Sequence, residues 1–251
     1  MHLLILIVAS LLSALFAAGA TAHPLRSQFT VPTSRGDLLV EGFGSCANAT
    51  CPAVIILSGS KGFGAAAYDE IGQVFQAAGL NAYLVHVLTA ADLDAIATAK
   101  GARTRIAYHS QRLPDWISAT QTVASYLKAQ PSHAGKVGIL GISLGAQIAS
   151  AVSAEQTGID ALVLVDGGFP SGYSHPSRSL PPLLLIWGSA DQTFPLSVGQ
   201  KLQQQAKGLG GTAFLDVYEG GTHDFFLRSE TRNADVAQQS ATAFLASHLS
   251  R

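Results

Sequence analysis

The hydrophobic positions of this chain gather in short continuous runs instead of alternating with polar residues. The runs are rich in Val, Ile and Leu and are bounded by Gly, Pro, Ser or charged residues. Such a run predicts a β-strand that is covered on both faces, because neither face then has to meet water. We expect strands at 53–57, 82–86, 137–140, 161–165, 183–187 and 213–218.

Segments with helical character separate these runs. One of them carries a largely apolar stripe at helical spacing, formed by Trp116, Thr120, Val123 and Leu127. Further helices are expected at 65–78, 143–156, 196–209 and 235–249. Strands that alternate with helices pair in parallel through right-handed crossovers, so the pattern predicts an α/β fold with a mostly parallel sheet and helices on both faces. The segment 37–42 is expected to open the sheet in antiparallel fashion.

Two connecting segments are longer than a minimal loop, and each follows the carboxyl end of a strand. They are 90–113, which carries many charged residues, and 167–182, which is rich in Gly, Pro and Ser. Chemistry in an open α/β sheet takes place beyond the carboxyl ends of the strands, so we expect both loops near a site. No repeat, charge block or linker divides the chain, which predicts a single domain over 23–251.

The first 22 residues have a different character. Residues 3–18 are apolar apart from two serines, and the small residues Ala20 and Ala22 stand at positions −3 and −1 of a cut after Ala22. This pattern predicts a signal peptide over 1–22, and hence a secreted or periplasmic protein without stable membrane insertion after cleavage. An uncleaved membrane anchor is the alternative, because the apolar run of about 17–19 residues is close to the shortest that spans a bilayer.

Composition and cysteine use fit an exported globular protein. The chain has 251 residues, 48% of them hydrophobic, and a net charge of −1, so it lacks the basic excess of a nucleic-acid protein. Its two cysteines, Cys46 and Cys51, are too few for a metal site of their own and are expected to form a local disulfide, with two unpaired thiols as the alternative. Asn48 between them begins an N-glycosylation triplet.

The strongest chemical signal is the pentapeptide Gly-Ile-Ser-Leu-Gly at 141–145. It follows the strand 137–140 directly and precedes a helical segment, as a nucleophile elbow does. The residues two before and two after Ser143 must lack bulk, because the turn presses its backbone against its neighbours. We therefore expect Ser143 to be held in a strained conformation with its hydroxyl exposed.

A serine hydroxyl needs a base, and the base needs a carboxylate that fixes its tautomer. His223 follows the last strand in a glycine-rich loop, and Asp191 follows the strand 183–187. We expect Ser143, His223 and Asp191 to form a catalytic triad, without a metal or an organic cofactor. Asp166 at the end of the preceding strand is the rival carboxylate, whereas Asp224 is expected to point away from the histidine.

Two other histidines are candidates for lining a pocket: His86 at a strand end and His109 in the long loop. A structural role for both is the alternative.

An acyl-transfer site also needs donors for an oxyanion. We expect the N–H groups of Leu144 and Ser60 in this role, with Lys61 as the alternate for Ser60 and near the pocket mouth. The glycine-rich segment 58–62 lacks the spacing of a phosphate-binding loop, so a nucleotide is not expected.

Together these motifs resemble one family. From about residue 53 to 226 the chain resembles the dienelactone-hydrolase-like branch of the α/β-hydrolases, through residues 57–60, 141–146, 187–191 with Pro195, and 218–225. The resemblance implies an eight-stranded, mostly parallel sheet and the triad Ser143, Asp191 and His223. Ser143 stands where dienelactone hydrolases carry cysteine, which favours a generic small-molecule ester as substrate.

The leading hypothesis is therefore an exported serine hydrolase that cleaves carboxylic esters through an acyl-enzyme. A peptidase, thioesterase or acyltransferase would use the same triad. An inactive hydrolase-fold binding protein would have lost a triad member, and all three are present.

Overall fold

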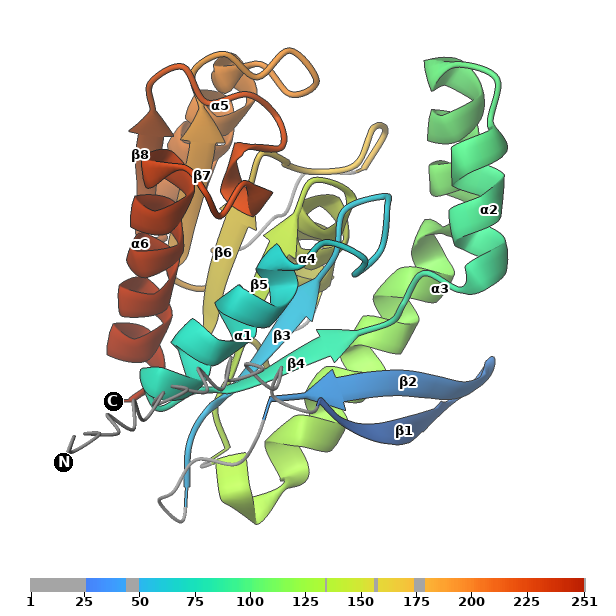
Figure 1. Ribbon diagram of the computed structural model, residues 1–251, viewed down its shortest axis with the longest axis vertical. Helices are drawn as coiled ribbons and strands as arrows, with labels where there is room; N and C mark the ends of the chain where they lie inside the picture. The colour runs from blue at the N-terminus through green and yellow to red at the C-terminus, as the bar shows by residue number, and fades with distance from the viewer. Residues whose placement is uncertain (1–25, 44–49, 134, 156–157, 174–178, 251) are drawn as a thin grey trace, which may run out of the picture.

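The computed structural model describes residues 26–43, 50–133, 135–155, 158–173 and 179–250. Their centre is an eight-stranded sheet in the order β1-β2-β4-β3-β5-β6-β7-β8 (Figure 1). β1 and β2 pair in antiparallel fashion, as do β2 and β4, and all other neighbours are parallel. The predicted mostly parallel α/β sheet is confirmed. The strands are β1 Ser27–Thr33, β2 Gly36–Gly42, β3 Ala53–Leu57, β4 Asn81–Val85, β5 Val137–Ile142, β6 Ala161–Val165, β7 Leu183–Gly188 and β8 Ala213–Tyr218.

Helices cover both faces of the sheet, which explains the continuous apolar runs. Every residue of β3, β5, β6 and β7 is buried. Side chains alternate between two cores: Ile55 of β3 joins the core beneath α3, α4 and α5, and Ile56 joins the core beneath α1 and α6. The helices are α1 Ala67–Ala77, α2 Ala90–Thr98, α3 Ala102–Ala129, α4 Leu144–Glu155, α5 Leu196–Gly208 and α6 Arg232–Leu249.

Two expectations for the first half of the chain were wrong. The segment 90–113 is not a long loop, because α2 and the first part of α3 occupy it (Figure 1). The start of α3 has only exposed or half-buried positions, so no apolar stripe marks it in the sequence. The sheet also begins one strand earlier than expected, since β1 pairs with β2 along its whole length.

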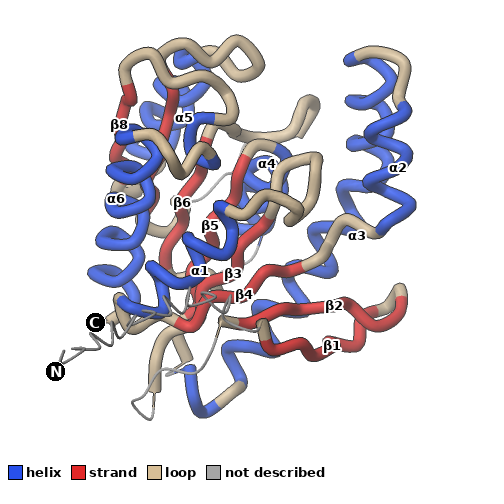
Figure 2. Tube along the Cα trace, in the orientation of Figure 1, coloured by secondary structure: helices blue, strands red, loops and turns tan. Residues whose placement is uncertain are grey.

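The loops that follow the parallel strands lie at the carboxyl edge of the sheet (Figure 2). This edge brings together residues that are far apart in the sequence. No helix within the described ranges is both long and apolar enough to cross a membrane.

Several predictions fall on residues outside the described ranges. The signal peptide over 1–22, Cys46 and Asn48 are among them. Cys51 is buried, and its backbone N–H donates to the Ser132 carbonyl at 2.9 Å. Signal cleavage, the disulfide and glycosylation therefore stay predictions.

Candidate active site

The nucleophile turn consists of a single residue between β5 and α4. Ser143 has φ of 54°, a left-handed conformation that is unfavourable for a residue with a side chain. Its N–H donates to the Val165 carbonyl at 2.9 Å, and its own carbonyl accepts the N–H groups of Ala146 and Gln147 at 3.0 and 3.1 Å. These bonds from both sides hold the expected strained turn in place.

The two flanking glycines are required by close backbone contacts, as predicted. A Cβ at Gly145 would collide with the Leu57 carbonyl of the neighbouring strand. A Cβ at Gly141 would collide with the Gly145 carbonyl across the turn. The pentapeptide is therefore a packing requirement of the strand–turn–helix unit.

Three side chains from separate loops meet at Ser143. Its Oγ lies 2.9 Å from His223 Nε2, and His223 Nδ1 lies 2.8 Å from Asp191 Oδ2. When the Nδ1 proton is donated to Asp191, Nε2 is free to accept the Ser143 proton. The second Asp191 oxygen accepts the N–H groups of Thr193 and Phe194 at 2.7 and 3.0 Å, which fixes the carboxylate.

Glycines also bring the loops of Asp191 and His223 into contact. A Cβ at Gly188 would collide with the Gly221 carbonyl, and that carbonyl accepts the Ala190 N–H at 2.9 Å. The last strand and the histidine loop can therefore approach the turn that carries the acid.

A cavity of about 560 Å³ opens beside the Ser143 and His223 side chains. Its walls include Ser60, Lys61, Tyr68, Phe226, Leu227 and Arg228. The first residue of α4 is Leu144, so its N–H has no acceptor within the helix. Ser60 lies in the turn after β3 and faces the same cavity. The structure thus brings both predicted oxyanion donors to the site region, and their role stays a prediction.

The model of the dienelactone hydrolase family matches residues 43–249. The chain belongs to the dienelactone hydrolase family. It is a carboxylic ester hydrolase with the α/β-hydrolase fold. No curated protein sequence matches the chain.

Solved structures share the fold at low sequence identity. A dienelactone hydrolase from Anabaena variabilis has a TM-score of 0.71 and 21% identity, over 90% of this chain and 99% of that one. A thermophilic carboxylesterase from a metagenomic library has a TM-score of 0.69 and 15% identity, over 91% and 92%. An esterase from Pyrobaculum calidifontis has a TM-score of 0.68 and 14% identity, over 88% and 84%.

In this dienelactone hydrolase family member, Asp191 is the carboxylate that contacts the histidine, whereas Asp166 and Asp224 have other partners. Asp166 is fully buried, with one oxygen 2.9 Å from the Gly188 N–H. Asp224 forms an exposed ion pair of 3.6 Å with Lys61.

The candidate histidines lie outside the main cavity. His86 contacts Glu41 at 2.9 Å and lines a neighbouring cavity of about 340 Å³ that shares Lys61 with the main one. His109 lies on α3 and lines a small pocket next to Leu144, and burial lowers its pKa. Both line pockets, and neither contacts Ser143 or His223 through a hydrogen bond.

Tyr68 is a site residue that the sequence did not reveal. Its hydroxyl accepts the Gly59 N–H at 3.3 Å, and it lines the cavity although its side chain is almost fully buried. Burial raises its pKa to about 12, so it remains a neutral phenol at physiological pH. Tyr68, Ile71 and Phe75 recur at helical spacing, which reads as a core-facing stripe of the helix expected at 65–78.

Asp166, Asp191 and His223 are also the one group of described residues whose spacing could hold a metal ion. Both ring nitrogens of His223 are already engaged, one by Ser143 and one by Asp191. The geometry therefore matches a catalytic triad better than a set of ligands.

Proposed function

We propose that this hydrolase cleaves small carboxylic esters through an acyl-enzyme formed on Ser143, with His223 and Asp191 completing a triad. The observation that carries the proposal is the pair of contacts at 2.9 and 2.8 Å that links the three side chains. A serine becomes nucleophilic when a base can remove its proton as it attacks.

The arrangement supports the following steps. Ser143 Oγ attacks the ester carbonyl while its proton passes to His223 Nε2, and buried Asp191 stabilises the imidazolium that forms. The N–H groups of Leu144 and Ser60 stabilise the oxyanion. The alcohol leaves with the proton from His223, and water activated by the same nitrogen then hydrolyses the acyl-enzyme.

Serine-directed labelling tests the nucleophile. Ser143→Ala should abolish labelling by a fluorophosphonate and lower kcat/KM for p-nitrophenyl acetate by at least about a thousandfold. His223→Ala should lower it by several powers of ten as well. Matched controls are Ser118→Ala on the exposed side of α3 and His248→Ala near the end of α6, both remote from the cavity. Turnover that survives in Ser143→Ala would refute the proposal.

The choice of acyl substrate is tested separately. A panel of matched esters, thioesters and anilides should show preference for the ester, because the leading hypothesis assigns an alcohol as the leaving group. A higher kcat/KM for an anilide would favour a peptidase, and one for a thioester would favour a thioesterase. Products of acyl transfer to an added alcohol would favour an acyltransferase.

Export belongs to the same proposal. The apolar segment 3–18 and the small residues before His23 support a signal peptide over 1–22 that directs the enzyme out of the cytoplasm. N-terminal sequencing of protein produced from the full chain should give His23 as the first residue. Recovery of the intact N-terminus in the membrane fraction would favour an anchor instead.

A further inference from the structure

Asp166 is a buried carboxyl group beside the proposed triad that the mechanism does not use. It follows β6, is 0% exposed and has φ of 46°. Among the described residues other than glycine, only Asp166 and Ser143 have a positive φ. Such a conformation persists only where the surroundings enforce it, and it is concentrated at functional sites.

The end of β6 touches both turns that build the site. The Val165 carbonyl accepts the Ser143 N–H at 2.9 Å, and the Asp166 N–H donates to the Ile186 carbonyl at 3.0 Å. Asp166 Oδ1 accepts the N–H of Gly188 at 2.9 Å. Gly188 lies three residues before Asp191 in the chain. Asp166 therefore lies between the nucleophile turn and the turn that holds the acid.

The polar atoms of Asp166 are close to the histidine as well. One oxygen or nitrogen atom from each of Asp166, Asp191 and His223 lies within 4.8 Å of the other two. Asp166 Oδ2 is buried and has no hydrogen-bond partner in the described part of the chain. A charged carboxylate with an unpartnered buried oxygen is unfavourable, so the geometry favours the protonated form.

The charges around Asp166 act in the same direction. Burial raises its pKa to about 8; the Gly188 N–H opposes this rise, and the negative charges of Asp191 and Asp224 add to it. His223 is the remaining titratable group in the cluster. Two neighbouring carboxyl groups resist simultaneous ionisation, so the charge state of Asp166 depends on that of Asp191.

We propose that Asp166 is a second acidic member of the site, a positioning residue that stays uncharged beside ionised Asp191 and supplies the negative charge next to His223 when the charge of Asp191 is removed. Loss of that charge removes a repulsion that keeps Asp166 protonated. Ionised Asp166 then stabilises the imidazolium of His223 from a neighbouring strand end.

This inference rests on the proposed triad, and a double-mutant cycle tests it. Wild type, Asp166→Asn, Asp191→Asn and the double variant are compared by kcat/KM for p-nitrophenyl acetate from about pH 5 to pH 9. The asparagine at 166 keeps an oxygen that can accept the Gly188 N–H but cannot ionise. Thermal unfolding of each variant verifies that it is folded.

The loss caused by Asp166→Asn should be at least about tenfold larger in the Asp191→Asn background than in the wild type. In Asp191→Asn alone, kcat/KM should also rise with pH through a transition that the double variant lacks. Equal losses in both backgrounds would mean that Asp166 only supports the fold, and would overturn the proposal.

A second measurement does not depend on turnover or on the double variant. Carboxyl-carbon NMR of the protein labelled in aspartate should show the Asp166 signal titrating at lower pH in Asp191→Asn than in wild type. The matched control Asp94→Asn, on the exposed side of α2, should leave the midpoint in place. An unmoved midpoint in Asp191→Asn would overturn the inference. Full turnover of Ser143→Ala, by contrast, would refute the proposed function and leave this titration unchanged.

Discussion

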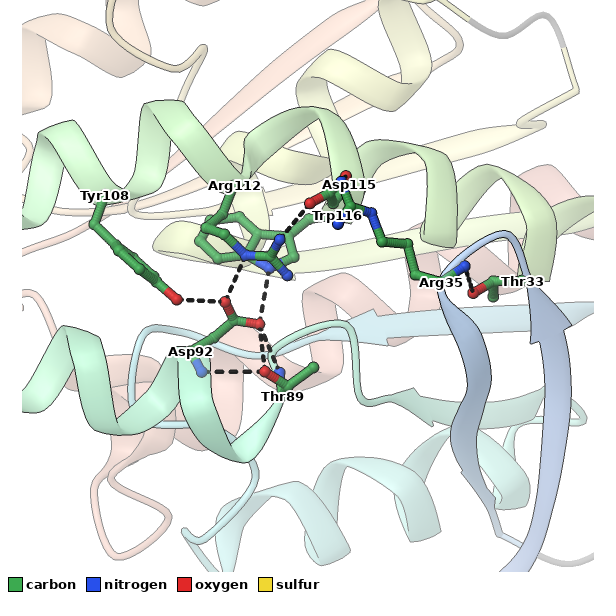
Figure 3. Close-up of polar contacts among 8 residues, drawn as sticks. All are labelled: Thr33, Arg35, Thr89, Asp92, Tyr108, Arg112, Asp115 and Trp116. Atoms are coloured by element: carbon green, nitrogen blue, oxygen red, sulfur yellow. Dashed lines mark hydrogen bonds and ion pairs between the residues drawn. The ribbon is translucent and has the colours of Figure 1, made fainter.

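Asp92 and Asp166 are both buried, with 1% and 0% of their surface exposed, yet their surroundings are opposite. Asp92 lies at the start of α2, where its carboxylate accepts bonds from the side chains of Tyr108, Arg112 and Trp116 and from both the N–H and the hydroxyl of Thr89 (Figure 3). Asp166 has one backbone donor and one oxygen without a partner among the described residues.

The pKa values of the two carboxyl groups are consequently shifted in opposite directions. Burial alone would raise the pKa of Asp92, but the bonds from Arg112, Tyr108 and Thr89 outweigh it and hold that pKa well below the usual range. Burial raises the pKa of Asp166 to about 8, because a single N–H does not compensate. The hydrogen-bond donors around a buried acid, and not its depth, therefore decide its charge.

The largest expected loss of stability comes from removing the carboxylate of Asp92, which accepts several hydrogen bonds. Asp92→Ala leaves the Arg112 guanidinium with the half-buried Asp115 as its remaining ion-pair partner among the described residues and removes the acceptor of the buried Trp116 N–H. We expect the free energy of unfolding in urea to fall by about 3 to 5 kcal/mol. Asp94→Ala, two residues along the same helix and exposed, is the control. A loss as small as that of the control would contradict the assigned role of Asp92.

The raised pKa of Asp166 should make the stability of the protein depend on pH. Unfolded Asp releases its proton near pH 4, whereas folded Asp166 keeps it up to about pH 8. Between these values the unfolded state binds fewer protons, so this contribution to stability is lost as pH rises.

Asp166→Asn removes that titration from the folded state. The stability of the variant relative to wild type should therefore increase by about 3 kcal/mol between pH 5 and pH 7, measured by urea unfolding at each pH. Asp94→Asn should show no such trend. A constant difference across the range would mean that Asp166 is ionised throughout.

The smallest effect concerns the cap of α2. The Thr89 hydroxyl accepts the Asp92 N–H at 3.1 Å and donates to the Asp92 carboxylate at 2.8 Å. Thr89→Ala should lower the free energy of unfolding by about 1 kcal/mol, as the loss of an N-cap does. Thr98→Ala, at the exposed end of the same helix, should cost less, and an equal loss would show that the cap contributes nothing specific.

The sequence was sufficient to predict the parallel strands and to select Ser143, Asp191 and His223, whose side chains lie in contact. Buried strands such as β5 and β6 are continuous apolar runs because both faces are covered, so their composition alone marks them. Gly141 and Gly145 mark the nucleophile turn because no side chain fits there. His223 and Asp191 could be placed because each follows a strand whose carboxyl end faces the same edge.

Other features depend on contacts between distant segments of the chain, which local sequence patterns do not encode. The start of α3 has only exposed or half-buried positions, and no apolar stripe marks it. The sequence pattern predicts Tyr68 only as a core residue. In the structure its hydroxyl contacts the Gly59 N–H and it lines the cavity. Whether Asp191 or Asp166 contacts His223 depends on the directions that their side chains take at the ends of two neighbouring strands. The charge of each buried acid depends on donors that come from distant segments, because an aspartate in the sequence carries no record of its neighbours in space.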